Sequence, residues 1–216
     1  MAIHVRTDNP NSVGPETVQV FDTAGSHTWT KPEGCILIKV QLVGAGGGAA
    51  GYWESGGAGG YSEEFIDVTE VESVSITVGA GGGYNGYYNG NCSVNLGGDG
   101  GTTTFGSYLY ATGGFGANRN HQHSGGRGGL GYGGDNSINF YGGGGSGHTN
   151  SAGSGAGGRG GASYFGAGAG DNRGSNHAKN GNGAPGSGGP GSRTDHGWGG
   201  QDGENGVVIV HEYYQR

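Results

Sequence analysis

The stretch that decides the fold is residues 35–48, CILIKVQLVGAGGG, in which a strand-forming segment runs directly into glycine. Residues 35–43 give the strongest strand signal of the chain, because aliphatic and β-branched side chains dominate them. The glycines that follow open a region that holds nearly all of the 59 glycines among 216 residues. Only Gly14, Gly25 and Gly34 precede that region. Glycine at this density opposes helix, and the chain length favours one domain.

Further strand signals alternate with the glycine tracts. Together the strand signals fall in four ranges, which are 17–43, 61–78, 102–112 and 207–213. Residues 1–16 are polar, contain two prolines and are expected to form an N-terminal arm that could serve as an attachment segment. Residues 17–216 are then one glycine-rich domain. Such a composition is also typical of disordered chains, but a strand near the C-terminus needs a pairing partner, and so an ordered fold is expected.

The glycine tracts between residues 44 and 206 limit the choice of ordered structure. Collagen requires a strict Gly-X-Y period with abundant proline, whereas this chain lacks that period and has 5 prolines. Extended polyglycine-II helices, with three residues per turn and a rise of about 3.1 Å, remain. The sequence therefore predicts a mainly β and irregular fold with almost no helix, in which a small β-sandwich-like region joins a bundle of polyglycine-II tracts. Within this bundle, Gly144→Val is expected to destabilise the fold, because a branched side chain does not fit where backbones touch.

The segments between the tracts differ in chemistry. If successive tracts are antiparallel, the connecting segments alternate between two ends of the bundle. One set is 52–55, 84–95, 117–124, 148–152 and 171–180, and the other is 61–78, 102–112, 135–141, 162–165 and 192–196. The second set is rich in strand formers, whereas the first is polar and aromatic. We therefore expect one end to be anchored in β-structure and the other to display loops.

The displayed loops contain the candidate binding residues. Tyrosine and tryptophan supply large, stiff contact areas with polar tips, and asparagine, arginine and histidine supply hydrogen bonds. The candidates are Tyr52, Trp53, Tyr84, Tyr87, Tyr88, Asn118, Arg119, His121, His123, His148, Arg173 and His177. The alternative is that the aromatic side chains only cover the end of the bundle. Cys35 and Cys92 fall at opposite ends in this layout, so both are expected to be free thiols.

Charge and composition exclude several classes. The formal net charge is −7 with 10 Lys and Arg, so the basic footprint of nucleic-acid binding is absent. No apolar run approaches the roughly 20 residues of a membrane span. The N-terminal residues lack the apolar core of a signal peptide, so synthesis in the cytoplasm is expected.

Other site patterns are weak. Residues 46–51 match the dinucleotide fingerprint G-x-G-x-x-G, but the motif must open a helix, and the glycine-rich sequence that follows is too short for one. His121 and His123 with His148 and His177 could form a metal site, which needs three or four convergent ligands, yet solvated or sugar-contacting histidines are the expected reading. We expect no catalytic residue, no metal and no cofactor.

The opening of the domain has a specific order of features. An aromatic strand residue, Phe21, and then Trp29-Thr30 precede the turn Lys31-Pro32-Glu33-Gly34, and residues 38–43 then form a strand that enters residues 44–48. This order resembles the opening of the glycine-rich domain found at the ends of many phage tail fibres. Residues 61–65, YSEEF, and 203–210, GENGVVIV, are also similar to that family, and the resemblance covers about residues 17–212. The alternation of tracts and loops is similar to the distal adhesins of T-even-like phages, in which polyglycine-II layers hold receptor-contacting loops.

The resemblance implies a non-enzymatic tail-fibre or tail-tip adhesin located in the virion. Its expected partners are a host-cell surface receptor, either a polysaccharide or an outer-membrane protein, and other fibre or tail proteins. The chain would be a homotrimer or a monomer on a trimeric fibre. Two other classes stay open, namely a virion structural or decoration protein without receptor binding, and an antifreeze-like polyglycine protein. The bulky loops argue against the antifreeze class, which needs a flat face of small residues.

Overall fold

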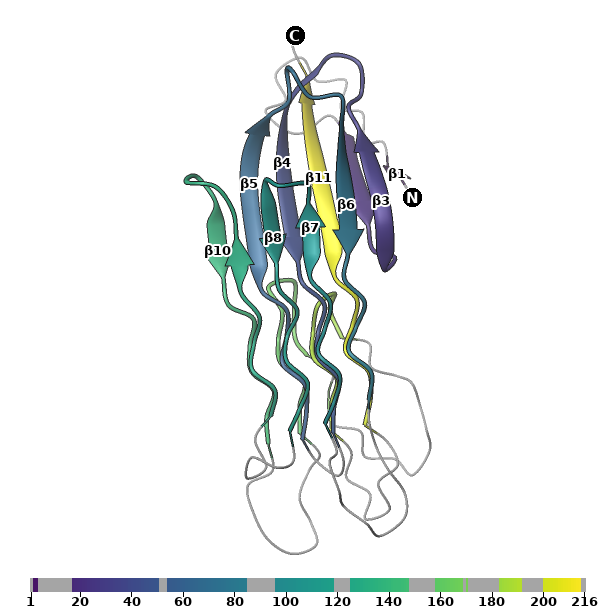
Figure 1. The fold of residues 1–216 in the computed structure, drawn as a ribbon, viewed down its shortest axis with the longest axis vertical. Coiled ribbons are helices and arrows are strands. Elements are labelled where there is room, and N and C mark those ends of the chain that lie inside the picture. The colour runs from purple at the N-terminus through teal and green to yellow at the C-terminus, as the bar shows by residue number, and fades with distance from the viewer. Residues whose placement is uncertain are drawn as a thin grey trace, which may run out of the picture.

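The structure, a computed structural model, is built from two β-sheets and the glycine tracts that continue from them (Figure 1). It describes residues 2–3, 17–50, 54–84, 96–118, 125–147, 158–168, 170, 183–191 and 200–214. The described residues contain strands, turns and extended tracts but no helix, and the predicted fold class is therefore confirmed. No helix in this part of the chain is long and apolar enough to cross a membrane.

The strands form two antiparallel sheets. They are β1 (Ala2–Ile3), β2 (Thr17–Phe21), β3 (Gly25–Thr30), β4 (Cys35–Val43), β5 (Tyr61–Asp67), β6 (Ser73–Val78), β7 (Thr103–Phe105), β8 (Leu109–Ala111), β9 (Gly131–Tyr132), β10 (Ile138–Phe140) and β11 (Val207–Tyr214). One sheet has the order β1-β2-β11-β4-β5-β10, and the other has the order β3-β6-β7-β8-β9. The C-terminal strand β11 lies between β2 and β4, which gives it the pairing partners that its sequence requires.

The core lies between the two sheets. Alternate residues of β4, namely Ile38, Val40 and Leu42, are buried, as are Val74 and Ile76 of β6. This period of two is what a strand with one buried face requires. The alternation visible in the sequence therefore places one face of each sheet in a shared apolar layer, and the two sheets form a sandwich.

Hydrogen bonds of the glycine tracts repeat every three residues. In tract 44–50, residues 44, 47 and 50 donate their backbone N–H groups to tract 54–60, residues 45 and 48 donate to tract 96–101, and residues 46 and 49 donate to tract 200–206. Carbonyl groups of the same tract accept from Gly82, Gly114 and Gly189. A helix with three residues per turn presents its donors in this rotation. Tract 44–50 is thus a polyglycine-II helix surrounded by six others.

Tract 54–60 obeys the same rule. Its residues 55 and 58 donate to tract 142–147, residues 56 and 59 donate to residues 189 and 186, and residues 57 and 60 donate to tract 112–118. Its carbonyl groups accept from tracts 44–50, 125–130 and 158–162. The two innermost tracts therefore replace an apolar core with backbone pairing in several directions, as the glycine content predicts.

Glycine is required where tracts approach closely, but it is not required everywhere. A Cβ atom on Gly47 would overlap the carbonyl oxygen of Phe115, and one on Gly57 would overlap that of Arg127. At Gly144 the nearest atom to an added Cβ is the oxygen of Gly126, at 3.5 Å, which is an ordinary van der Waals distance. The expectation that Gly144 lies where backbones touch is wrong, because this residue belongs to an outer tract and faces away from the bundle.

A turn interrupts the last glycine-rich segment. Ser187 donates its N–H to the carbonyl of Ala184 at 2.9 Å, and Gly186 has a φ of 74°. Proline at the second position and glycine at the third, as in Ala184-Pro185-Gly186-Ser187, are the residues of a type II turn. A Cβ on Gly186 would lie 2.7 Å from the side chain of Val43, so the turn lies beside the end of β4. The sequence predicts a single tract between the connecting segments 171–180 and 192–196, but the described part of it, residues 183–191, reverses direction at this turn.

Candidate functional site

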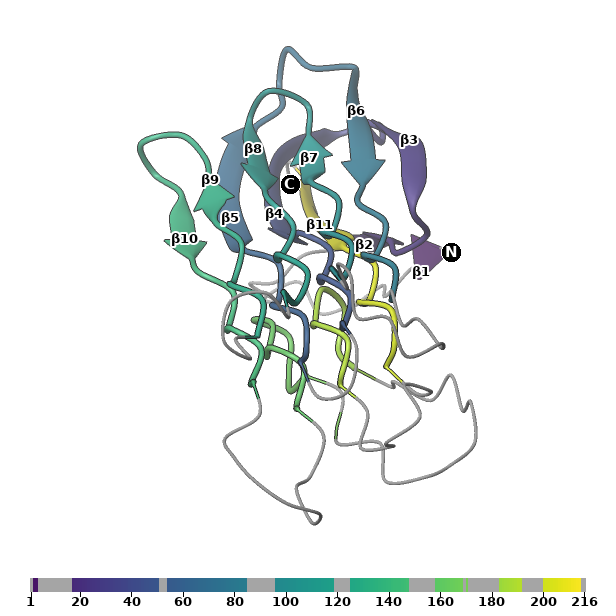
Figure 2. The same cartoon turned by 60° about the horizontal axis from the view of Figure 1, so that its bottom comes forward.

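The end of the bundle farthest from the sheets, called here the distal end, is where five pairs of tracts stop together. The tracts are antiparallel there. For example, Ala50 donates to Glu54 at 3.1 Å, and Gly191 donates to Gly158 at 2.9 Å. Leu96 and Asn118 form an antiparallel bridge at the same level. The described tract ends gather at this end of the bundle (Figures 1 and 2). In the sequence, residues 51–53, 85–95, 119–124, 148–157 and 192–199 connect them. Polar and aromatic sequences thus leave the described bundle at one end.

Two predicted contact residues belong to the described part of the chain. The backbone N–H of Tyr84 donates to Asp202 Oδ1 at 2.6 Å, and its ring lies so close to Gly200 that a Cβ there would overlap it. Asn118, at the end of tract 112–118, forms an antiparallel bridge with Leu96 of the neighbouring tract 96–101. Both residues are therefore at the distal end. The others, Tyr52, Trp53, Tyr87, Tyr88, Arg119, His121, His123, His148, Arg173 and His177, lie outside the described residues.

The expected assignment of segments to the two ends needs one correction. The segment that precedes Gly183 was expected at the polar end, but Ala184 donates its N–H to Ala167 at 3.3 Å and begins the turn beside Val43. Residues 183 and 184, which follow the segment that contains Arg173 and His177, therefore lie at the sheet end. Conversely, segment 192–196 was expected at the sheet end, yet the described residues 191 and 200 on either side of it lie at the distal end. The physical cause is the turn at 184–187. It adds a reversal of the chain at the sheet end, so the connecting segment after it lies at the opposite end from the one expected.

A groove lies on the side of the bundle next to the distal end. Its volume is about 630 Å³, and tracts 96–101, 112–118 and 125–130 supply its walls. Leu96, Asp99, Phe115 and Arg127 are among its lining residues. The exposed fraction is 53% for Phe115 and 40% for Leu96. None of these four residues was expected to be functional.

A sequence signal for the groove does exist. In a helix with three residues per turn, every third residue lies on the same face, and outer tracts carry their large side chains with this spacing. Tract 96–101 has Leu96 and Asp99 three residues apart, and tract 112–118 has Phe115 and Asn118. Side chains that break a glycine tract at intervals of three thus mark the face that a tract turns away from the bundle.

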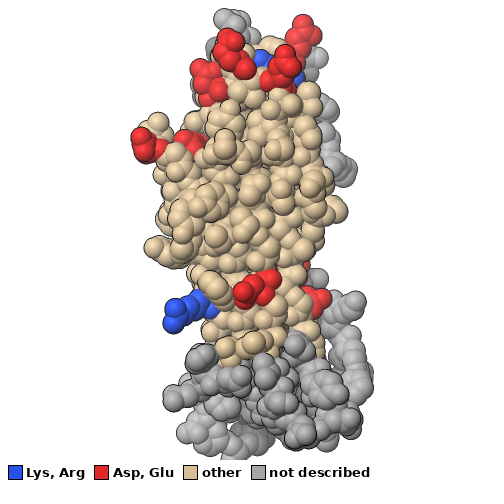
Figure 3. Space-filling model, in the orientation of Figure 1, with Lys and Arg blue, Asp and Glu red and all other residues tan. Residues whose placement is uncertain are grey.

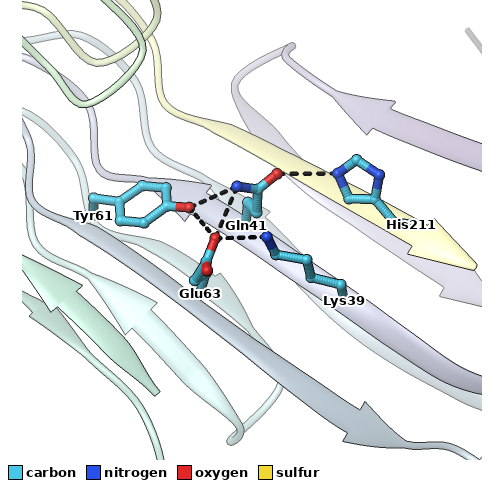
Figure 4. Close-up of polar contacts among 5 residues, drawn as sticks. All are labelled: Lys39, Gln41, Tyr61, Glu63 and His211. Carbon is cyan, nitrogen blue, oxygen red and sulfur yellow. Dashed lines mark hydrogen bonds and ion pairs between the residues drawn. The ribbon is translucent and has the colours of Figure 1, made fainter. Parts of the chain in front are cut away.

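A polar cluster occupies the outer face of the six-stranded sheet (Figure 4). The amide nitrogen of Gln41 donates to the hydroxyl of Tyr61 at 2.7 Å and to Glu63 Oε2 at 2.9 Å. The same carboxylate oxygen accepts from the Tyr61 hydroxyl at 2.6 Å and pairs with Lys39 Nζ at 3.0 Å. His211 Nε2 lies 3.0 Å from Gln41 Oε1. Adjacent strands β11, β4 and β5 bring these five side chains into one row.

The cluster shifts several pKa values. Burial, and then the hydrogen bond donated to Glu63, raises the pKa of Tyr61. Burial would raise the pKa of Glu63, but hydrogen bonds from Tyr61, Lys39 and Gln41 outweigh it, and the pKa lies below its ordinary value. Burial, followed by the charge of Lys39, lowers the pKa of His211. The cluster thus favours neutral tyrosine and histidine beside a charge-paired carboxylate, and it holds the ring of Tyr61 in place.

Aromatic rings surround Tyr61. The ring of Tyr164 stacks on it with centroids 3.6 Å apart, and Phe165 contacts it edge-on at 5.8 Å.

Figure 3 shows that the middle of the visible face carries no charged side chains, whereas acidic and basic side chains appear above and below it. Among the described residues, no group of three or more histidine, cysteine, aspartate or glutamate side chains is arranged to hold a metal ion.

Comparisons with known proteins agree with the architecture. No curated protein matches the chain significantly. The family model described as "glycine-rich domain" matches residues 22–213, which include strands β3 to β10, most of β11 and every described glycine tract. Its matched region begins just after β2 and ends one residue before the end of β11. The chain therefore belongs to the glycine-rich domain family.

Proposed function

We propose that this chain is a phage tail-fibre or tail-tip adhesin that recognises a host-cell surface receptor through segments at the distal end of its glycine bundle. The observation that carries the proposal is that five polar or aromatic segments continue from tract ends at one end of the bundle. Binding residues often lie on connecting segments that a rigid scaffold positions. Here the scaffold is a set of tracts that are hydrogen-bonded to several neighbours each.

The proposal places the protein in the virion without enzymatic activity. Its partners are the receptor at the distal end and other fibre or tail proteins elsewhere, with residues 1–16, of which Ala2–Ile3 pair with β2 as β1, as the candidate attachment segment. The sheet end is suited to a supporting role, because buried apolar residues and backbone pairing already connect both sheets to the tracts.

Adsorption of the purified protein to a panel of bacterial strains tests the proposal. The double variants Tyr87→Ala with Tyr88→Ala and His121→Ala with His123→Ala are expected to reduce cell binding by about tenfold or more at an unchanged melting temperature. Tyr141→Ala is the matched control, since its side chain is 81% exposed but lies next to β10 at the sheet end.

The opposite result would favour a decoration protein. In that case, the wild-type protein binds no strain, or both double variants bind as well as wild type, while virions that lack the protein still adsorb to their host normally.

A further inference from the structure

We infer that the groove beside the distal end is a saccharide-binding subsite. This inference rests on the proposed adhesin function and names the ligand class that one of its surfaces would take. The groove is lined by Phe115, Leu96, Asp99 and Arg127 from three neighbouring tracts. Its volume of about 630 Å³ falls within the range of roughly 300–1,000 Å³ that is typical of small-ligand sites.

The side chains of the groove are not needed to build the bundle. Several outward positions on other tracts are small, as at Ala80, Gly83 and Gly144, and an added Cβ at Gly83 would meet no atom within 4 Å. A tract can therefore present glycine or alanine to solvent. On the groove side, the corresponding positions instead hold an exposed phenylalanine, a carboxylate and a guanidinium group. Large apolar side chains that gather with polar groups on an exposed surface are characteristic of a binding site.

The backbone of the groove argues against a peptide strand as the ligand. Strand addition requires a run of free N–H and C=O groups, but several N–H groups along these walls are already used. Gly97 donates to Ala117 at 2.9 Å, and Phe115 donates to Arg127 at 2.9 Å. Gly126 donates to Ser55 at 2.8 Å. With these donors already paired, the exposed side chains are the main groups that the groove offers for recognition.

The available side chains match the two kinds of surface that a sugar ring has. A pyranose presents an apolar C–H face, which the exposed ring of Phe115 can stack against, and hydroxyl groups that both donate and accept hydrogen bonds. Asp99 accepts the N–H of Gly116 on Oδ1 at 2.8 Å, which leaves Oδ2 able to accept from a hydroxyl. The guanidinium of Arg127 can only donate, so the groove offers an acceptor and a donor beside the stacking ring.

The walls are also arranged before a ligand binds. Phe115 and Arg127 are joined through the backbone, and Asp99 is joined to the residue after Phe115. Because little ordering is required on binding, a small saccharide loses less affinity to conformational entropy there than it would on a flexible loop.

A two-part experiment tests the inference. The purified full-length protein is titrated with polysaccharide extracted from strains that adsorb it and is also applied to an array of immobilised hexoses, amino sugars and uronic acids. Phe115→Ala is expected to weaken saccharide binding by about tenfold, and Arg127→Ala is expected to weaken it as well. Asp99→Asn retains an oxygen for the Gly116 N–H but changes the second acceptor to a donor, so its effect reports on the carboxylate. Phe140→Ala is the control, because this ring is exposed on β10.

Cell binding then separates the two levels of the proposal. Periodate, which oxidises vicinal diols of surface sugars, is expected to abolish the adsorption that depends on Phe115, whereas protease treatment of the cells leaves it. Adsorption that survives periodate and Phe115→Ala but is lost after protease would overturn the saccharide inference and leave the adhesin function intact. Absence of adsorption to every strain would instead overturn the adhesin function. In that case, saccharide binding on the array that is lost in the Phe115→Ala variant would still support the subsite. No binding in either format overturns the inference.

Discussion

The indole Nε1 of Trp29 donates a 2.7 Å hydrogen bond to Glu212 Oε1, and this bond joins the two sheets. Trp29 lies on β3, Glu212 lies on β11, and their exposed fractions are 0% and 1%. The carboxylate also accepts from Gln19 Nε2 at 2.7 Å and from the hydroxyl of Thr17. A buried carboxylate is costly unless donors surround it, and here four side chains from two sheets provide them, the fourth being the Tyr214 hydroxyl at 3.4 Å.

Glu212→Ala is expected to lower the free energy of unfolding by about 3 kcal/mol, because it leaves the buried N–H of Trp29 without its acceptor. Urea denaturation measures the change. Glu70→Ala is the control, since Glu70 lies in an exposed turn, and it is expected to change stability by less than about 0.5 kcal/mol. Equal stability of the two variants would show that the bond contributes nothing.

Gly57→Ala and Gly144→Ala are expected to have opposite effects on stability. The methyl group at residue 57 would overlap the backbone of Arg127, so a loss of at least roughly 1–3 kcal/mol is expected from overpacking. At residue 144 the nearest atom is 3.5 Å away, and the variant should gain about 0.4–1 kcal/mol because alanine restricts the unfolded chain. Melting temperatures of the pair give the comparison. Similar losses at both positions would contradict the distinction between inner and outer tracts.

Stability is expected to fall as the pH drops below about 6.5, in part because of His211. The ordinary pKa of this side chain is 6.5, and burial and the charge of Lys39 lower it in the folded protein. The unfolded chain therefore takes up a proton that the native state resists, and the free energy of unfolding decreases with acidification until the folded pKa is reached.

His211→Gln keeps a donor for Gln41 and removes the titration. The melting temperature of this variant should decline less between pH 7.5 and 5.5 than that of the wild-type protein. The lowered pKa of Glu63 acts in the same direction at more acidic pH, below its ordinary value of 4.5, and so the His211 contribution is distinguished by the pH range. If the melting temperatures of the wild-type protein and His211→Gln decline in parallel between pH 7.5 and 5.5, His211 does not contribute to the loss of stability.

Cys35 and Cys92 are expected to remain free thiols in the folded chain. Cys35 is buried at the start of β4, and β4 with tract 44–50 separates it from the distal end by about 45 Å at roughly 3.1–3.3 Å per residue. Cys92 is four residues from Leu96 at that end, a reach of at most about 14 Å. Mass spectrometry under non-reducing conditions should find no bridge between them.

Alkylation adds a second observation on Cys35. Burial, and then the negative charge of Glu212, raises the pKa of its thiol, so it should react with iodoacetamide much more slowly in the native protein than after denaturation. A rapid native reaction at Cys35, or a bridge to Cys92, would contradict the placement of β4.

Local patterns in the sequence were sufficient for several parts of the structure. The alternation in residues 35–43 and 73–78 marks buried faces, because a strand exposes its faces with a period of two. The high density of glycine predicts polyglycine-II tracts, since helix is disfavoured and collagen lacks its required period here. The short strands β1, β9 and β10 lie outside the four predicted strand ranges, because they have only two or three residues and depend on β2, β8 and β5 for pairing.

The sequence by itself determined that glycine tracts must pair with one another, because without side chains only their backbone groups can supply cohesion. It could not determine which tracts lie inside. Gly57 and Gly144 have the same chemistry and similar neighbours in the chain, yet one is enclosed and the other faces outward. The turn at 184–187 and the groove at Phe115 were likewise decided by tertiary structure. Each depends on contacts between residues far apart in the chain, such as Gly186 with Val43, and a local pattern carries no information about those distances.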